Sequence, residues 1–95
     1  MSSSLHFAWD QTKADANLHK HAVSFEMAST AFDDPLSITI ADPKHSVGEE
    51  RAILIGTTLE GKLVIVVHVD SGDTVRIISA RLATRSERNV YEETS

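Results

Sequence analysis

The run Leu63–Val67, which reads LVIVV, constrains the fold of this chain more than any other segment. Consecutive β-branched and apolar residues of this kind are typical of a strand that is covered on both faces and therefore central in its sheet. The run is far shorter than the roughly 20 apolar residues of a membrane-spanning helix. Residues 51–59 and 74–80 read as neighbouring strands, with an EG pair and a DSGD segment as the tight turns between them. The centre of the chain therefore predicts an antiparallel meander.

Two helices are predicted in the first third of the chain. Asp10 can cap a helix over residues 11–20, because its carboxylate can accept from the unpaired amides of the first turn. Ser24 can cap a second helix, which carries an apolar stripe at helical spacing. The DDP segment at Asp33 to Pro35 ends this helix, since the residue before proline disfavours helical backbone angles.

The last helix is expected from about Arg85 to Glu92, because Thr84 and Glu87 have the spacing of a capping box. Short strands are also expected in LHFAW (5–9) and LSITIAD (36–42), and PKHSVGE (43–49) reads as a loop. The predicted order is β-α-α-β-β-β-β-α, an α+β fold in one domain over residues 1–95. Residues 1–4 and 93–95 are expected to be frayed.

The strand register decides which side chains share a face. Pairing Leu59 with Lys62 in the first hairpin predicts that Arg51 lies on the same face as His68. In the second hairpin, a bulged loop at Gly72 would add Arg76 to that face, and a strict two-residue turn would place it on the other. We favour the bulged loop, because it gathers the three side chains.

The charge distribution limits the classes of partner. The net charge is −5; residues 1–50 hold eight acids and three bases, and residues 51–95 hold six of each. Binding to nucleic acid therefore cannot rest on an overall basic field and must be local, while the acidic half could attract a basic partner. The absence of cysteine and of a signal-peptide pattern at the start leads us to expect a cytoplasmic protein with no disulfide.

The first helix carries a stripe of candidate ligand-binding residues. Lys13, Asn17 and Lys20 are spaced i, i+4 and i+7, so they share one face of a helix. The simpler interpretation of this stripe is the solvated face of the helix. His21 is a candidate proton carrier near neutral pH, or merely a cation that favours the helix C-terminus. The five histidines lack the spacing of a metal site, and we expect neither a metal nor another cofactor.

Arginine is the more specific signal. A guanidinium stays charged, and its planar fork matches two phosphate oxygens, so Arg76 and Arg81 are candidates for holding an RNA phosphate. Cleavage by the 2′-hydroxyl of the ribose needs such charge stabilisation together with a proton donor and acceptor, and it needs no metal. We expect Arg85 and Arg88, in contrast, to pair with glutamates such as Glu87 on an exposed helix.

Three segments resemble the BrnT family of ribonuclease toxins, which are partners of BrnA antitoxins in type II toxin–antitoxin modules. They are FAWDQTKADANLHKHAVSFEMASTAFDDP, EERAILIG and RIISARLATRSERNVYE, and together they extend from Phe7 to Glu92. The matching motifs are Trp9-Asp10, Lys13, Asn17, Lys20-His21, Ser24-Phe25, Asp34-Pro35, Glu50-Arg51, Gly56 and residues 76–81.

The resemblance implies a fold similar to RelE-type toxins and RNA cleavage that arrests translation. It implies a BrnA-type antitoxin, typically two with two toxins, whose ribbon-helix-helix region carries all operator DNA binding in autoregulation, and no membrane partner. The catalytic set that we derive with it is Lys20, His21, Glu50, Arg51, Arg76 and Arg81, and the RNA-binding set is Lys13, Asn17 and Tyr91. Either His21 or Glu50 would move the proton, and Tyr91 would stack on a base or simply pack the last helix.

Two other functions are compatible with the sequence. The chain could be a non-catalytic corepressor whose acidic half docks a basic antitoxin. It could also be a domain that binds a small anion reversibly through its arginines. Growth arrest and RNA decay on expression of the chain alone would separate the toxin from both.

Overall fold

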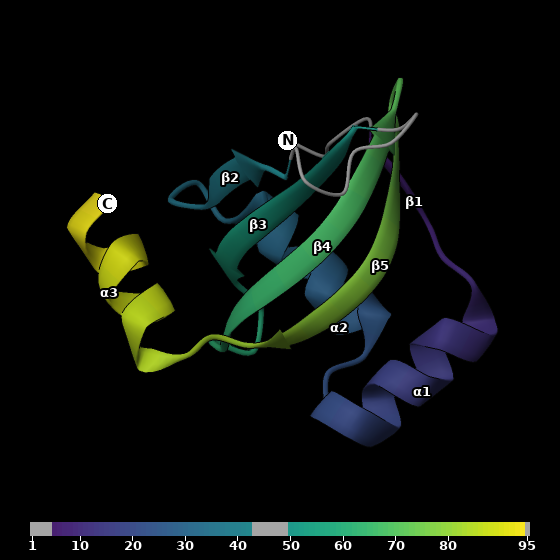
Figure 1. The fold of residues 1–95 in the computed structure, drawn as a ribbon, viewed down its shortest axis with the longest axis horizontal. Helices are drawn as coiled ribbons and strands as arrows, with labels where there is room; N and C mark the ends of the chain where they lie inside the picture. Colours follow the sequence, from purple (N-terminus) through teal and green to yellow (C-terminus); the bar gives the residue numbers. More distant parts are fainter. Residues whose placement is uncertain (1–4, 43–49, 95) are drawn as a thin grey trace.

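The fold is a five-stranded sheet with three helices, seen in a computed structural model that describes residues 5–42 and 50–94. The elements in chain order are β1 (His6–Ala8), α1 (Gln11–His21), α2 (Phe25–Ser29), the 3-10 turn η1 (Thr30–Asp33), β2 (Ile38–Ala41), β3 (Arg51–Thr57), β4 (Leu63–Ser71), β5 (Thr74–Leu82) and α3 (Arg85–Thr94). In Figure 1, α2 lies behind the sheet, α1 lies near β5, and α3 lies at the β3 side. None of the described helices is long and apolar enough to cross a membrane.

The sheet has the strand order β1-β5-β4-β3-β2, so β4 is central as its apolar run predicts. Leu63 to Val66 are all buried. The strands β2 to β5 form the expected antiparallel meander. The expectation of a purely antiparallel sheet is wrong for β1, which pairs with β5 in parallel. The segment with α1 and α2 carries the chain from β1 at one edge of the sheet to β2 at the other edge. The meander then ends with β5, which lies beside β1 and runs in the same direction.

The register that we predicted for the first hairpin is wrong by one residue. Thr58, and not Leu59, pairs with Lys62 across the turn, with its N–H donating to the Lys62 carbonyl at 2.9 Å. The loop therefore has three residues and ends at Gly61, whose φ of 81° is left-handed. Because side chains alternate between faces, this shift places Arg51 and His68 on opposite faces of the sheet.

The second hairpin also differs from our preferred prediction. Ser71 pairs with Thr74, so the turn has two residues, with Gly72 at a φ of 61°. The irregularity lies further along β5, where Val67 pairs with Ser79 but His68 pairs with Ile77, leaving Ile78 as an extra residue. Arg76 consequently lies on the same face as Arg51, away from His68.

The helix starts form as the sequence predicts. The Asp10 carboxylate accepts from the Thr12 N–H at 2.8 Å, and the Ser24 hydroxyl accepts from the Met27 N–H at 3.0 Å. In the capping box, the Thr84 N–H donates to Glu87 at 2.8 Å, and the Glu87 N–H donates to the Thr84 hydroxyl at 3.2 Å.

The chain ends depart in one respect from the expectation of fraying. Helix α3 continues to Thr94, so residues 93 and 94 are helical. Residues 1–4, the predicted loop 43–49 and residue 95 lie outside the described residues.

The main core lies between α2 and the sheet. Phe25, Ala28 and Ala31 are fully buried against strand residues such as Val66. Gly56 permits the close approach of η1 to the sheet, because a Cβ at this position would lie 2.9 Å from the Ala31 carbonyl oxygen.

Helix α1 is fixed to the edge of β5 by a single amide side chain. β1 pairs with residues 74–76 of β5, and among the described residues no strand lies beside the later part of β5 on this side. The Asn17 Nδ2 donates to the Ala80 carbonyl at 2.8 Å and to the Val23 carbonyl at 3.0 Å. Its Oδ1 accepts from the Ala80 N–H at 3.1 Å. Asn17 thus acts as a substitute strand, and we call these three bonds the Asn17 clamp.

Replacing Asn17 by alanine would leave the amide of Ala80 and two buried carbonyls without their partners. We expect Asn17→Ala to lower the free energy of unfolding by about 3 kcal/mol, since each unsatisfied buried group costs about 1–3 kcal/mol. Urea denaturation followed by circular dichroism measures this. Asn89→Ala on the exposed surface of α3 is the matched control, with an expected change within about 0.5 kcal/mol. Equal denaturation midpoints for the two variants would contradict the clamp.

Candidate functional site

The predicted arginines all lie on the face of the sheet turned away from α2. Arg51 and Arg76 both lie in register with Val69 of the central strand, and Arg81 lies in register with Ile65 on the same face. We call this surface the arginine face. Arg51 and Arg76 are two strands apart, a separation of about 10 Å that long guanidinium side chains can bridge around one anion.

A groove next to the arginine face holds the predicted residues of α1. Lys13, Lys20 and His21 line it together with Ile78 and Ser79 of β5, and its volume is about 250 Å³. We call it the basic groove. The bulge at Ile78 lies in its floor, where an extra residue redirects the following side chains. Nothing in the local sequence signals this bulge, and for that reason Ile78 and Ser79 were absent from the predicted site.

Asn17 borders the same groove, but its side chain has a structural role in this fold. Its side chain is 7% exposed, and its amide is occupied by the Asn17 clamp. The stripe of three polar residues on α1 is therefore divided. Lys13 and Lys20 are exposed, and Asn17 attaches the helix that presents them.

Arg81 makes the ion pair that we expected from Arg85 or Arg88. Its two terminal nitrogens each donate to one Glu87 carboxylate oxygen at 2.8 Å, which is a bidentate arrangement. The hydrogen bonds from Arg81 lower the pKa of Glu87 to about 2. Arg85 and Arg88 lie exposed on α3. Arg81 therefore faces the site with part of its donor capacity already used.

Tyr91 packs α3 against the sheet, which is the alternative to stacking on a base. Its hydroxyl donates to Asp34 at 2.6 Å and accepts from the Thr57 hydroxyl at 3.2 Å. Burial alone would raise the pKa of Asp34, but the bonds from Tyr91 and from the backbone amides of Thr57 and Leu36 bring it below its ordinary value. The predicted RNA-binding role of Tyr91 is thus not supported, and Asp34 emerges as the anchor of α3.

Glu50 and His68 lie apart from the basic groove. The Glu50 side chain is exposed next to Arg51, and its carbonyl accepts from the Asp70 N–H at 3.4 Å. His68 lies on the other face, 2% exposed, with its Nδ1 at 2.7 Å from Asp70. Its ring meets Phe32 edge to face, with the ring centroids 4.9 Å apart. His68 is therefore a buried core residue, as the apolar strand around it favours.

The groups that the fold gathers are suited to an anion and a proton. Lys13 and Lys20 offer charge-assisted donors, and His21 offers a nitrogen that can exchange a proton. Arg51 and Arg76 extend the positive charge along the sheet. Among the described residues, no three His, Cys, Asp or Glu side chains are grouped as metal ligands would be.

Comparison with known proteins gives a family match, a similar solved structure and one negative result. The profile of the family described as "Ribonuclease toxin, BrnT, of type II toxin-antitoxin system" matches residues 9–87. The crystal structure of the Brucella abortus ribonuclease toxin BrnT is similar to this fold, with a TM-score of 0.63 and 26% sequence identity. That match covers 85% of this chain and 99% of the Brucella chain. No curated protein sequence matches significantly.

The ion pair between Arg81 and Glu87 predicts a specific dependence on pH. The pKa of Glu87 in the folded protein is about 2, below its ordinary value of 4.5, so the pair stabilises the fold above about pH 4.5 and loses this effect as pH falls toward 2. We expect Glu87→Gln to lower the melting temperature at pH 6 and to have progressively less effect below pH 4.5. Glu92→Gln, at an exposed position of the same helix, is the control in thermal melts at each pH. If Glu87→Gln lowers the melting temperature by the same amount at every pH from 6 to 2, the ion pair is not the cause of the effect.

Proposed function

The chain belongs to the BrnT family of ribonuclease toxins of type II toxin–antitoxin systems, and we propose that it is an endoribonuclease that arrests translation by cutting RNA in the basic groove. The observation that carries this proposal is the position of α1, which brings Lys13, Lys20 and His21 against the bulged edge of β5. These three groups can hold one phosphate and move one proton beside it.

The proposed reaction uses the ribose as its own nucleophile. His21 takes the proton of the 2′-hydroxyl, and the 2′-oxygen attacks the adjacent phosphorus. Lys13 and Lys20 stabilise the negative charge that develops on the phosphate oxygens, and the Lys20 ammonium gives a proton to the departing 5′-oxygen. The products are a 2′,3′-cyclic phosphate and a 5′-hydroxyl. No metal is needed, because the attacking oxygen belongs to the substrate.

The arginine face would bind the RNA strand beyond the cleaved phosphate. We assign Arg51 and Arg76 to phosphates on one side of the basic groove, and Arg81 to a phosphate contact through the donors that Glu87 leaves available. Glu50 is the alternative base. We favour His21 because it lines the groove, whereas Glu50 lies at the start of β3.

The proposed partner is a BrnA-type antitoxin in the cytoplasm, with two toxins and two antitoxins in the assembly. Operator DNA would be bound only through the antitoxin, since a chain of net charge −5 has no overall attraction for a polyanion. We also propose that the sheet and helices form a RelE-like fold, in which the sheet is the platform for RNA.

Cleavage assays on the toxin freed from its antitoxin test the proposed mechanism. We expect His21→Ala and Lys20→Ala each to lower the cleavage rate of a single-stranded RNA by about 10²–10³-fold, as removal of a proton carrier or a charge-stabilising donor does. Arg85→Ala, which removes an exposed cation of α3 that does not line the groove, should cut at the wild-type rate. The 3′ ends of the products should be cyclic phosphates.

The same assay separates the proposal from its alternative. If the folded wild-type toxin, freed from antitoxin, leaves RNA intact and cells expressing it grow normally, the chain is a non-catalytic corepressor. If His21→Ala cuts at the wild-type rate, His21 has no part in the reaction.

A further inference from the structure

We propose that a second groove, between α2 and the β3–β4 hairpin, binds a segment of the antitoxin that combines an aliphatic side chain with basic residues. We call it the hairpin groove. It has an apolar compartment lined by Leu18, Val23, Met27 and Val64, and an acidic compartment lined by Asp33, Asp34 and Leu59. Thr58 borders both compartments, so they are neighbours on the surface. The inference rests on the proposed function only for the existence of the antitoxin.

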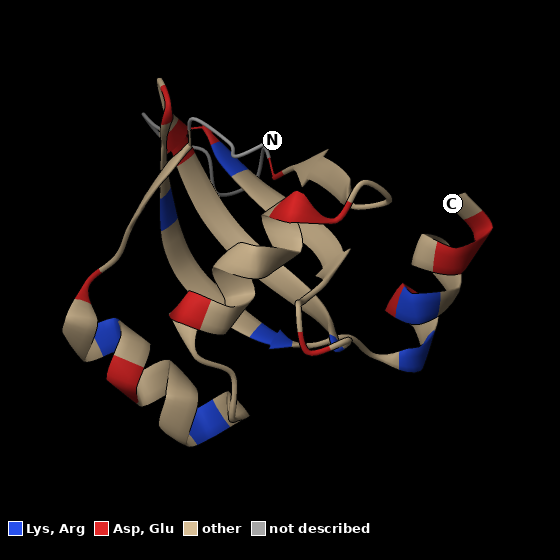
Figure 2. Cartoon of the chain, turned by 180° about the vertical axis from the view of Figure 1, so that it is seen from behind, with Lys and Arg blue, Asp and Glu red and all other residues tan. Residues whose placement is uncertain are grey.

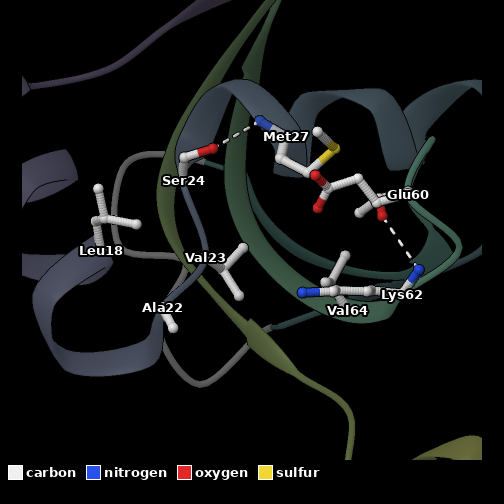
Figure 3. A pocket seen from close by; sticks show the side chains of 9 residues that line it. Leu18, Ala22, Val23, Ser24, Met27, Glu60, Lys62 and Val64 are labelled. Carbon is white, nitrogen blue, oxygen red and sulfur yellow. Dashed lines mark hydrogen bonds between the residues drawn. The ribbon is translucent and has the colours of Figure 1, made fainter.

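The apolar compartment has the size and lining to hold one aliphatic side chain. Its volume is about 140 Å³. In Figure 3, Val23 and Val64 lie at its base, Met27 closes one side, and the long side chain of Lys62 extends over Val64. The unbranched thioether of a methionine adapts its shape to an incoming group, a property of protein surfaces that bind peptides.

Two exposed leucines lie at the border of the groove, and the backbone of one of them is fixed by hydrogen bonds. Leu18 is 50% exposed, and Leu59, at the hairpin tip, is 81% exposed. The backbone of Leu59 is nevertheless fixed, because its N–H donates to the Thr30 hydroxyl at 2.9 Å and Thr30 in turn donates to the Met27 carbonyl at 2.6 Å. An apolar side chain on an ordered backbone loses little conformational freedom on binding, which favours association.

The other compartment determines the charge of the occupant. Its volume is about 190 Å³, and its lining residues include two aspartates and neither lysine nor arginine. Asp33 is exposed, while Asp34 is held by Tyr91 and two backbone amides. Glu26 on α2 and Glu60 in the hairpin add negative charge on the same side of the molecule, and Figure 2 shows acidic positions on α2, η1 and the hairpin turn. A basic segment is therefore complementary to this end of the groove.

The negative charge of the acidic compartment disfavours RNA and a second copy of this chain as occupants of the groove. The phosphates of RNA would be repelled, and a second copy of this chain, with net charge −5, offers no general attraction. The hairpin groove also lies on the α2 side of the sheet, whereas the arginines lie on the opposite face. An antitoxin segment bound here would hold the toxin without occupying the basic groove, so binding and neutralisation would be separable.

Affinity measurements with the purified, full-length cognate antitoxin test the apolar compartment. We expect Leu59→Glu and Leu18→Glu each to raise the dissociation constant by about tenfold or more, as loss of an interface anchor does. Isothermal titration calorimetry measures this constant. Val90→Glu is the matched control, because Val90 is 45% exposed on α3 and lines neither compartment, and it should bind as the wild type does. Both leucines are exposed, so the variants should fold, which circular dichroism verifies.

The acidic compartment is tested by salt. Asp33→Asn should weaken antitoxin binding at low ionic strength and should reduce the salt dependence of the dissociation constant, because one ionic contact is lost. Asp15→Asn, an exposed change on α1, should leave the salt dependence unchanged. Equal slopes for Asp33→Asn and the wild type would overturn the basic character of the segment.

Two further outcomes decide the proposal. If Leu59→Glu and Leu18→Glu bind the antitoxin as tightly as the wild type does, or lose no more affinity than Val90→Glu, the hairpin groove is not the docking site. RNA cleavage by the freed Leu59→Glu toxin should equal that of the wild type, because Leu59 does not line the basic groove. A wild-type toxin that cuts no RNA would remove the proposed activity and leave this binding comparison fully interpretable.

Discussion

The part of the candidate site that α1 contributes depends on one amide group. In the part of the chain that the structure describes, no strand lies beside the later part of β5 on the α1 side, and a bare strand edge at this position would leave buried donors and acceptors unpaired. Asn17 supplies both a donor and an acceptor to the same residue, Ala80, as a strand would. Only a side-chain amide offers both groups in a plane; a carboxylate of the same shape has no N–H. The amide helps to fix the position and rotation of α1. Lys13 and Lys20 therefore line the groove beside Ile78.

The two sides of the sheet carry opposite chemistry. The arginine face and the basic groove offer cations, and the hairpin groove offers carboxylates beside apolar surface. A protein that binds a polyanion while carrying a net charge of −5 must separate its charges in this way, since the average field would repel the ligand. The sheet keeps the two sets of charges apart, and their mutual attraction falls with this distance and with screening by the salt solution on each side.

Local patterns predicted the local structure well. The caps at Asp10 and Ser24, the capping box and the central apolar strand depend on neighbours within a few residues, and all are confirmed. The main errors concern how the strands pair. The register of the first hairpin depends on whether Thr58 or Leu59 begins the turn, a difference of one residue that moves Arg51 to the other face. The parallel pairing of β1 and the bulge at Ile78 have no signal of their own in the sequence.

The role of Asn17 could not be read from α1 alone, because its partner lies 63 residues further along the chain. That separation has a consequence for synthesis. Until Ala80 has been added and has emerged from the ribosome, α1 has no strand edge to attach to, and the lysines that it carries have no groove to line. The complete candidate site therefore forms only late in synthesis, after the last residues of β5 have been added.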